Sequence, residues 1–309
     1  MSDLVIVFAG SPAAAVPSLQ VLTASRHSVA AVLTREDSPQ GRRRELTPTA
    51  VAGAATQLGL PIIRANRLAG AATEAVSMLR PDLGVIVAYG GLVREPLLTI
   101  PRLGWINLHF SLLPRWRGAA PVQHAIIAGD EVTGASVFQL VPELDAGVVF
   151  GQFTQPIGAE ETAGQLLDSL AVSGAELLVR VVDAIADGIA RGEPQQGDVT
   201  LAPKLQLPDA RLDFAEHAST VLNRLRGVTP EPGAFTRVDG MRIKIIEAAI
   251  VSDEPKLAAG QLELRSGRVL VGTSSDPLEL VTVHPDGKKP MKAADWWRGR
   301  GADAGTVAR

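Results

Sequence analysis

Hydrophobic and polar positions follow two recurring patterns along the first two-thirds of the chain. Short apolar runs predict buried strands at residues 4–9, 28–34, 61–64, 83–89 and 105–109. Helix-like stretches lie between or after them, at residues 13–25, 48–59, 71–79, 121–128 and 162–187, with Thr47 and Pro48 at the start of the second. This alternation predicts an α/β fold, with a doubly wound, mostly parallel sheet covered by helices on both faces.

The pattern changes after residue 204. One helix-like stretch at residues 215–226 precedes short strand-like runs at residues 234–238, 242–250, 260–264, 269–272 and 278–283. Short strands separated by Gly, Pro and Asp turns predict a small β-barrel. We therefore expect an α/β domain over residues 1–190, a polar linker over residues 191–204, and a smaller β domain over residues 205–309.

Two polar side chains stand at the end of the strand predicted for residues 105–109. Asn107 and His109 are two positions apart, so on a strand they project from one face. Ligands of parallel sheets bind beyond the carboxyl ends of strands. Asp145 follows 36 residues after His109. An amide, an imidazole and a carboxylate together can hold an oxyanion, move a proton and tune the group that moves it.

The string Asn-Leu-His-Phe-Ser-Leu-Leu-Pro at residues 107–114 resembles the motif of the folate-dependent formyltransferases. Its extension to Pro121 resembles the branch of that family that acts on methionyl-tRNA. Further likeness lies in residues 8–12, in Gly41-Arg42 and in residues 287–291, so the resemblance covers essentially the whole chain. It implies a Rossmann-like catalytic domain followed by an oligonucleotide-binding-type (OB-like) barrel that binds tRNA.

The resemblance also implies the reaction. The formyl group of 10-formyltetrahydrofolate would pass to the α-amine of methionyl initiator tRNA, giving N-formylmethionyl-tRNA for translation initiation. Asn107 would donate to the oxyanion, and protonated His109 would donate to the oxyanion or to the leaving nitrogen. Asp145 would favour the imidazolium and relay the proton of the amine through water.

Other segments carry binding roles through the same resemblance. The loop formed by Ser111, Leu112, Leu113 and Pro114 would hold the folate. Arg42, Arg43 and Arg44 would approach the acceptor end of the tRNA, although a solvated loop is the plain alternative. Residues 89–91 could flank a pterin or form a glycine turn. Lys288, Lys289 and Lys292 could face phosphates or solvent.

Several positions depart from the family pattern. Phe110 replaces the usual Gly, Ala146 replaces a Thr, and Ala13 and Ala14 replace acidic and aromatic residues. Where the family has a pair of basic residues in the early loop, this chain has Arg44-Glu45. These changes bear on substrate recognition and leave Asn107, His109 and Asp145 intact.

Charge, composition and the absence of certain motifs limit the classes of ligand and the compartments that this protein could have. The net charge of −3 does not indicate a nucleic-acid binder, so tRNA would have to meet local basic clusters. Cysteine is absent, and the histidines show no metal-ligand spacing such as His-Glu-x-x-His, so we expect no metal. No phosphate-binding glycine motif occurs, so nucleoside triphosphate and dinucleotide binding have no support. No apolar run is long enough to span a membrane, and the start lacks a secretory signal. We expect a cytoplasmic monomer.

Three alternative functions remain open at this point. A glycinamide ribonucleotide formyltransferase shares the fold, folate and catalytic trio, but normally lacks a β domain such as that predicted after residue 204. A formyltetrahydrofolate hydrolase would use the same trio on water. A non-catalytic RNA-binding protein would not need the trio at all.

Overall fold

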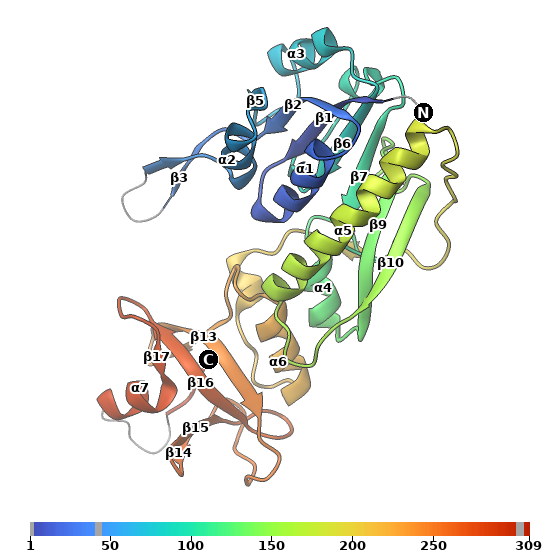
Figure 1. The fold of residues 1–309 in the computed structure, drawn as a ribbon. Helices are drawn as coiled ribbons and strands as arrows, with labels where there is room; N and C mark the ends of the chain where they lie inside the picture. Colours follow the sequence, from blue (N-terminus) through green and yellow to red (C-terminus); the bar gives the residue numbers. More distant parts are fainter. Residues whose placement is uncertain (1–2, 41–44, 301–305) are drawn as a thin grey trace. The chain divides into compact units, whose positions relative to one another are not determined.

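The computed structural model describes residues 3–40, 45–300 and 306–309 (Figure 1). Arg42, Arg43 and Arg44, the predicted tRNA contacts, lie outside the described residues. The chain divides into two compact units. The first comprises Met1–Pro121, Val132–Pro156 and Leu167–Pro203, and the second comprises Val122–Glu131, Ile157–Leu166 and Lys204–Arg309. The domain boundaries expected at residues 190 and 205 stay a prediction.

A mostly parallel sheet forms the centre of the first unit, with the strand order β10-β9-β7-β6-β1-β2-β5. Its strands are β1 (Val5–Gly10), β2 (Ser28–Thr34), β5 (Ile62–Arg64), β6 (Leu83–Val87), β7 (Trp105–His109), β9 (Val132–Gln139) and β10 (Val149–Pro156). The five strands from β7 to β5 run parallel, which confirms the predicted sheet. Strands β9 and β10 are antiparallel additions that the sequence analysis did not predict.

The chain order of the parallel strands makes the sheet doubly wound. From β1 the chain moves outward through β2 to β5, then returns to the other side of β1 as β6 and β7. The carboxyl ends of β1 and β6 are therefore neighbours at the point where the strand order reverses. Open α/β sheets bind ligands at this point. The end of β7, with Asn107 and His109, is one strand away.

Helices cover both faces of this sheet, as predicted. The helices of this unit are α1 (Val16–Thr23), α2 (Ala50–Gln57), α3 (Ala71–Leu79) and most of α5 (Ala163–Ala186), whereas α4 (Pro121–Ala128) belongs almost wholly to the second unit. Gly174 of α5 lies so close to Leu108 of β7 that a Cβ there would be 3.1 Å from its side chain. Val76 of α3 packs with Ala9 and Trp105 on the opposite face. Figure 1 shows α1 and α5 on one face of the sheet.

Helix α2 begins two residues later than the sequence predicts. Thr49 is its N-cap, and its hydroxyl accepts a hydrogen bond from the backbone N–H of Ala52 at 3.0 Å. Thr47 instead ends β4 (Glu45–Thr47), which pairs with β3 (Ser38–Gln40). The Thr49 cap sets the start of the helix, because its hydroxyl satisfies an N–H of the first turn that has no partner within the helix. Pro48 therefore precedes the helix instead of opening it.

The second unit contains an antiparallel sheet in the order β12-β13-β16-β15-β14. Its elements are β12 (Phe235–Val238), β13 (Met241–Ile250), β14 (Leu262–Arg265), β15 (Arg268–Val271), β16 (Leu278–Pro285), β17 (Met291–Lys292), α6 (Ala218–Gly227) and α7 (Ala293–Gly299). Ala308 pairs with Val238 beside β12, and Val307 pairs with Gln261 beside β14. The chain end thus links the two sheet edges, which agrees with the predicted small barrel.

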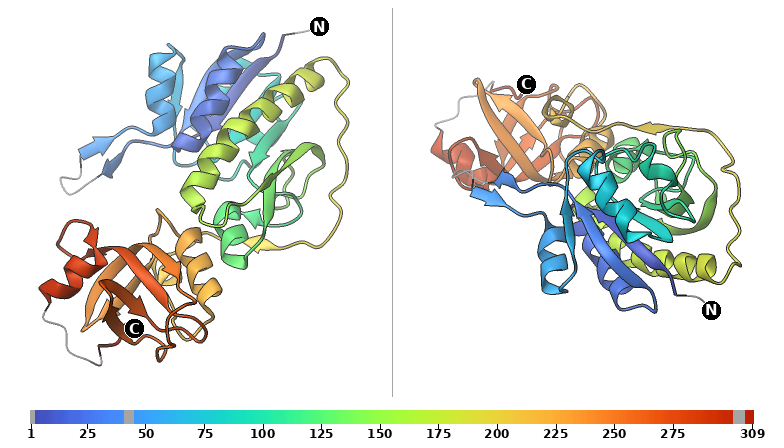
Figure 2. Two further views of the ribbon diagram at one scale, coloured as in Figure 1. Left: turned by 60° about the horizontal axis from the view of Figure 1, so that its bottom comes forward. Right: turned by 90° about the horizontal axis from the view of Figure 1, so that it is seen from above.

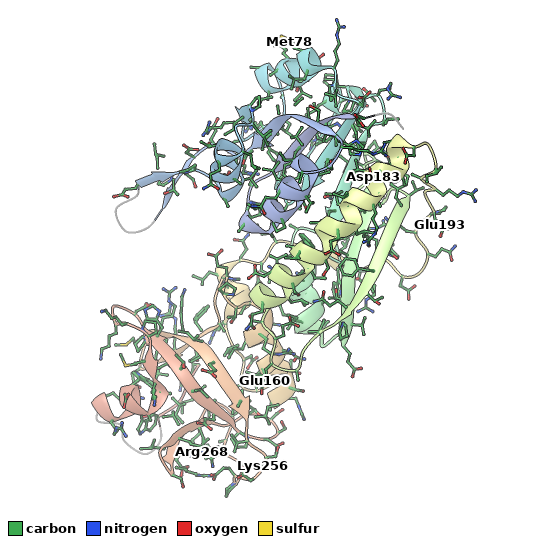
Figure 3. All side chains as sticks on the ribbon, viewed as in Figure 1. Met78, Glu160, Asp183, Glu193, Lys256 and Arg268 are labelled. Carbon is green, nitrogen blue, oxygen red and sulfur yellow. The ribbon has the colours of Figure 1, made fainter. Side chains whose placement is uncertain are left out.

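The segment expected to be a linker packs along the first unit. After α5 it runs as a long loop beside β10 (Figure 2), where the Val149 N–H donates to the carbonyl of Glu193 at 2.8 Å. The side chain of Glu193 is exposed (Figure 3). The segment then forms β11 (Leu201–Ala202), which pairs in parallel with β8 (Arg117–Gly118). Among the described residues, no helix is long and apolar enough to cross a membrane.

Candidate active site

Strand β7 places Asn107 and His109 on the face that also carries Trp105. Trp105 is fully buried, and its indole N–H donates to the carbonyl of Leu97 at 2.9 Å. Its ring occupies the space over Gly84 in β6, where a Cβ would lie 2.1 Å from a ring atom. The tryptophan therefore fixes the strand that ends in the two polar side chains.

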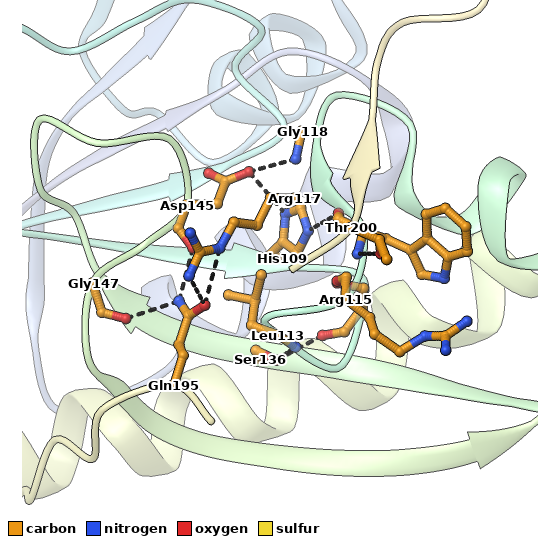
Figure 4. Close-up of polar contacts among 12 residues, drawn as sticks. His109, Leu113, Arg115, Arg117, Gly118, Ser136, Asp145, Gly147, Gln195 and Thr200 are labelled. Carbon is orange, nitrogen blue, oxygen red and sulfur yellow. Dashed lines mark hydrogen bonds and ion pairs between the residues drawn. The ribbon is translucent and has the colours of Figure 1, made fainter. Parts of the chain in front are cut away.

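His109 is held from both ring nitrogens (Figure 4). Its Nε2 lies 2.9 Å from the carbonyl of Trp116, and its Nδ1 lies 3.8 Å from Oδ2 of Asp145. A carbonyl only accepts, so Nε2 carries a proton and donates to it; this assigns the tautomer of the neutral ring. Nδ1 is therefore the nitrogen that can gain or lose a proton, and it faces Asp145.

Burial is the largest influence on His109. Only 5% of the residue is exposed. Burial lowers its pKa below the ordinary value, while the charge of Asp145 and the hydrogen bond to Trp116 act in the opposite direction. Asp145, which the sequence predicts to favour the imidazolium, does raise the pKa of His109 through its charge. Burial outweighs it, so the resting imidazole is neutral near pH 7.

Asp145 occupies an unusual backbone conformation in the loop between β9 and β10. Its φ is +46°, in the left-handed region that non-glycine residues seldom adopt. Its Oδ2 accepts a hydrogen bond from the Gly118 N–H at 2.7 Å, and 9% of the residue is exposed. The carboxylate that faces His109 is therefore also anchored to the loop after Pro114.

Asn107 is partly exposed, between buried neighbours on β7. No hydrogen bond to its side-chain amide occurs within the part of the chain that the structure describes. The amide is available to a ligand at the carboxyl edge of the sheet.

The loop expected to hold folate is tied to the protein by its own backbone. The Leu113 N–H donates to Oγ of Ser136 at 3.2 Å, and the Leu113 carbonyl accepts from Gln152 at 3.2 Å. Ser136, which lies opposite His109 in β9, also donates to the carbonyl of Ser111 at 2.6 Å. Folate contact by Ser111, Leu112, Leu113 and Pro114 stays a prediction. The backbone N–H and carbonyl of Leu113 are therefore both engaged within the protein, and its side chain is buried.

A surface cavity of about 450 Å³ borders this loop. Its lining includes Leu113, Gln152 and Gln195, and it does not include Asn107, His109 or Asp145. The cavity is therefore separate from the trio.

Comparison with known protein families matches both parts of the chain. Residues 3–182 match the family model described as formyl transferase, and residues 204–301 match the model for the formyl transferase C-terminal domain.

The chain belongs to the formyl transferase family.

The relatives extend over nearly the full length. A methionyl-tRNA formyltransferase of Leifsonia xyli is 61% identical over 97% of this chain and 98% of its own. A methionyl-tRNA formyltransferase of Thermobifida fusca is 51% identical over 95% of this chain and 96% of its own.

Solved structures of low identity share the fold of this formyl transferase. A sugar 3N-formyl transferase, WlaRD, crystallised with dTDP and 5-N-formyl-tetrahydrofolate, has a TM-score of 0.68 at 14% identity, covering 94% of this chain and all of its own. HypX from Aquifex aeolicus, in complex with tetrahydrofolic acid, has a TM-score of 0.64 at 18% identity, covering 97% of this chain and 48% of its own.

A second polar cluster of this formyl transferase lies at the strand-order reversal. Ser11, after β1, donates from Oγ to the carbonyl of Tyr89 at 3.2 Å and accepts from the Arg35 N–H at 3.3 Å. The Arg35 guanidinium also donates to the carbonyls of Tyr89 and Gly90. Burial raises the pKa of Tyr89, so its phenol stays a neutral donor, here to the carbonyl of Ala65. The turn at residues 89–91 is thus well fixed; pterin contact stays a prediction.

The remaining predictions from the sequence concern a lysine cluster, metal binding and Phe110. Lys288, Lys289 and Lys292 are exposed near β17, which leaves both interpretations of that cluster open. Among residues 3–40, 45–300 and 306–309, no group of three or more His, Cys, Asp or Glu has a metal-binding arrangement. Phe110, which replaces the usual glycine, is buried with 6% of its surface exposed.

Sequence reasoning missed the backbone partners of the trio. Trp116 and Gly118 hold His109 and Asp145, yet they entered only as part of the resemblance. One signal was present in the sequence, since the string Gly-Ala-Ala-Pro at residues 118–121 is typical of a turn before a helix. The structure explains its glycine, because Gly118 has a φ of +129°.

Proposed function

We propose that this enzyme transfers the formyl group of 10-formyltetrahydrofolate to the α-amino group of methionyl initiator tRNA. The observation that carries the proposal is the 61% identity with a methionyl-tRNA formyltransferase over 97% of the chain. The trio of Asn107, His109 and Asp145 supplies the groups that this transfer requires. We propose the cytoplasm as the compartment and the monomer as the active form.

The reaction needs proton handling at two points. The neutral amine attacks the formyl carbon, a new C–N bond forms, and the carbonyl oxygen becomes an oxyanion. The amine then loses one proton, the bond from carbon to N10 of the folate breaks, and N10 gains one proton. A free α-amine has a pKa of about 7.7–8.0, and esterification lowers it, so a strong base is unnecessary.

The site geometry suggests a role for each member. The unbonded amide of Asn107 donates to the oxyanion. Neutral His109 accepts the amine proton at Nδ1, directly or through water, because Nε2 already donates to Trp116. Asp145 stabilises the imidazolium that forms, at a distance of 3.8 Å. The same Nδ1 proton then passes to N10, so one imidazole acts first as base and then as acid.

The test is direct formylation. The protein is incubated with charged initiator tRNA and 10-formyltetrahydrofolate, and the amino acid released from the tRNA is analysed by mass. We expect N-formylmethionine. Formate released at the same rate with and without tRNA would instead indicate a hydrolase, and tRNA binding without product would indicate a binding module.

A further inference from the structure

The connector between α5 and the second unit touches both loops that hold the catalytic pair. It contributes Gln195 and Thr200, two partly buried residues among exposed neighbours. All contacts described below lie within the first unit. Figure 4 shows the connector residues beside His109 and Asp145.

Gln195 supports the loop of Asp145. Its side-chain amide donates to the carbonyl of Asp145 at 2.7 Å and to the carbonyl of Gly147 at 2.9 Å. Its Oε1 accepts from Nη2 of Arg117 at 2.6 Å and from Nε at 3.1 Å. All hydrogen-bonding groups of the glutamine amide are therefore used, and Arg117 fixes which end faces the loop.

The loop of Asp145 needs such support. The residue has a φ of +46°, a left-handed conformation that costs free energy for a residue with a Cβ, so contacts that hold it there stabilise the loop. Two hydrogen bonds from one rigid amide to carbonyls two residues apart fix this turn. The conformation of this turn directs the Asp145 carboxylate toward Nδ1 of His109.

Thr200 supports the other partner. Its Oγ1 accepts from the Trp116 N–H at 2.9 Å, and its carbonyl accepts from the Arg117 N–H at 2.9 Å. Trp116 also has a positive φ, of 61°. The carbonyl of Trp116 is the group that accepts the Nε2 proton of His109. Thr200 therefore fixes the residue that assigns the histidine tautomer.

We infer that Gln195 and Thr200 are positioning residues for formyl transfer, which hold Asp145 and His109 in the geometry that proton transfer requires. The inference rests on the proposed function and deepens it. Residues 191–204, expected from the sequence to be a linker, then hold the two loops that carry Asp145 and Trp116. Neither residue touches the reacting atoms, so both act through the pair.

The first test replaces Gln195 with Met, which keeps the length and removes the donors and the acceptor. Misplacing catalytic groups by about 1 Å costs roughly 10²-fold, so kcat should fall about 10- to 100-fold. The exposed neighbour Gln196 provides the matched control, since Gln196→Met changes the same chemistry without these bonds. A kcat of Gln195→Met equal to that of the control would overturn this half of the inference.

The second test uses Thr200→Val and Thr200→Ser. Valine keeps the shape and removes Oγ1, whereas serine keeps the hydroxyl. We expect Thr200→Val to lower kcat about tenfold and Thr200→Ser to restore most of it, as for other supporting hydrogen bonds around a site. Equal losses in both variants would show that packing, not the hydrogen bond, is what matters.

A double mutant separates positioning from general structural damage. If Gln195 acts through Asp145, Gln195→Met should cost little once Asp145→Asn is already present. A purely structural role would cost the same factor in both backgrounds, and that result would overturn the inference. Should Gln195→Met fail to fold, Gln195→Glu takes its place in the same cycle, since it retains the acceptor and loses the donors.

The parent protein keeps the two proposals distinguishable. A parent that makes no formylmethionyl-tRNA refutes the proposed function. A productive parent whose Gln195 and Thr200 variants behave like the Gln196 control refutes the positioning role alone.

Discussion

Nδ1 of His109 lies 3.8 Å from Oδ2 of Asp145, while Nε2 of the same ring donates to the carbonyl of Trp116 at 2.9 Å. One ring nitrogen is therefore committed to the backbone, and the other is left for proton transfer beside a carboxylate. The two ring nitrogens of His109 therefore have different roles, one in positioning the ring and one in proton transfer.

The pH dependence of kcat should report the charge of Asp145. His109 must be neutral to act as a base, so activity is lost as pH falls through its folded-state pKa. Burial lowers that pKa, and the charge of Asp145 raises it. In Asp145→Asn the plateau should drop, and the acid limb should move to lower pH. Single-turnover rates across pH measure both.

The substrate amine titrates in the same pH region, but it is identical in the two enzymes. Only the displacement between parent and variant is therefore informative. An acid limb of Asp145→Asn at the same or higher pH than that of the parent contradicts the assigned pairing.

Replacing Asn107 with Ala should lower kcat about 10²–10³-fold, which is the usual loss for one oxyanion donor. Its amide has no other hydrogen bond among the described residues, so folding stability should change little. Rates at saturating substrate measure the effect. If the kcat of the variant lies within threefold of that of the parent, a difference of roughly 0.6 kcal/mol in activation free energy, Asn107 is not the oxyanion donor.

His109→Ala and Asp145→Ala should each lower kcat about 10²–10⁴-fold, as members of one proton-handling unit. The double variant should lose far less than the product of the two single losses, because groups that act as a unit are not additive. Three rate constants beside that of the parent complete the cycle. Losses that multiply would show that the two side chains act independently.

Much of the fold follows from patterns of apolar residues. The strongly apolar runs became β1, β2, β6 and β7. The periodic stretches became α3 and α5, and the bounds of these two helices lie within one residue of the prediction. Strand β9 escaped prediction because it contains Gly134-Ala135-Ser136 where a typical strand has larger residues. The structure explains the glycine, since a Cβ at Gly134 would lie 1.9 Å from the carbonyl oxygen of Phe153.

The candidate site was predictable only in part. The spacing of Asn107 and His109 placed them on one strand face, residue chemistry suggested Asp145 as their partner, and the family resemblance gave Asp145 its catalytic role. The roles of the two ring nitrogens were not predictable, because they depend on the carbonyl of Trp116. Gln195 and Thr200 lie in a polar Gly/Pro segment that has the composition of a plain linker. Their hydrogen bonds depend on tertiary contacts between distant residues.

Gly84→Ala should destabilise the protein by about 3 kcal/mol or more, because a Cβ there would overlap the Trp105 ring at 2.1 Å and overpacked cores relax poorly. Gly53→Ala is the matched control. Gly53 lies within α2 with no atom within 4 Å of the added Cβ, so this variant should gain about 0.5–1 kcal/mol. Urea denaturation measures both. A Gly84→Ala variant as stable as the parent contradicts the packing assigned to Trp105.

Arg42, Arg43 and Arg44 lie outside the described residues, and their tRNA contact stays a prediction. Replacing all three with Ala should weaken tRNA binding and leave folate binding nearly unchanged. Each phosphate contact contributes about 0.7–0.9 to the slope of log K against log salt, so its magnitude should fall by roughly one to three. An unchanged slope together with an unchanged KM for tRNA would identify the segment as a solvated loop.

The central claim is that this chain formylates methionyl initiator tRNA through the His109–Asp145 pair. The most direct measurement is a single-turnover reaction with formyl-labelled 10-formyltetrahydrofolate and methionyl initiator tRNA, comparing the parent with His109→Ala. The account predicts that the parent moves the label onto the methionine nitrogen and that the variant does so about 10²–10⁴-fold more slowly. Label released as formate, or transferred equally fast by the variant, would contradict it.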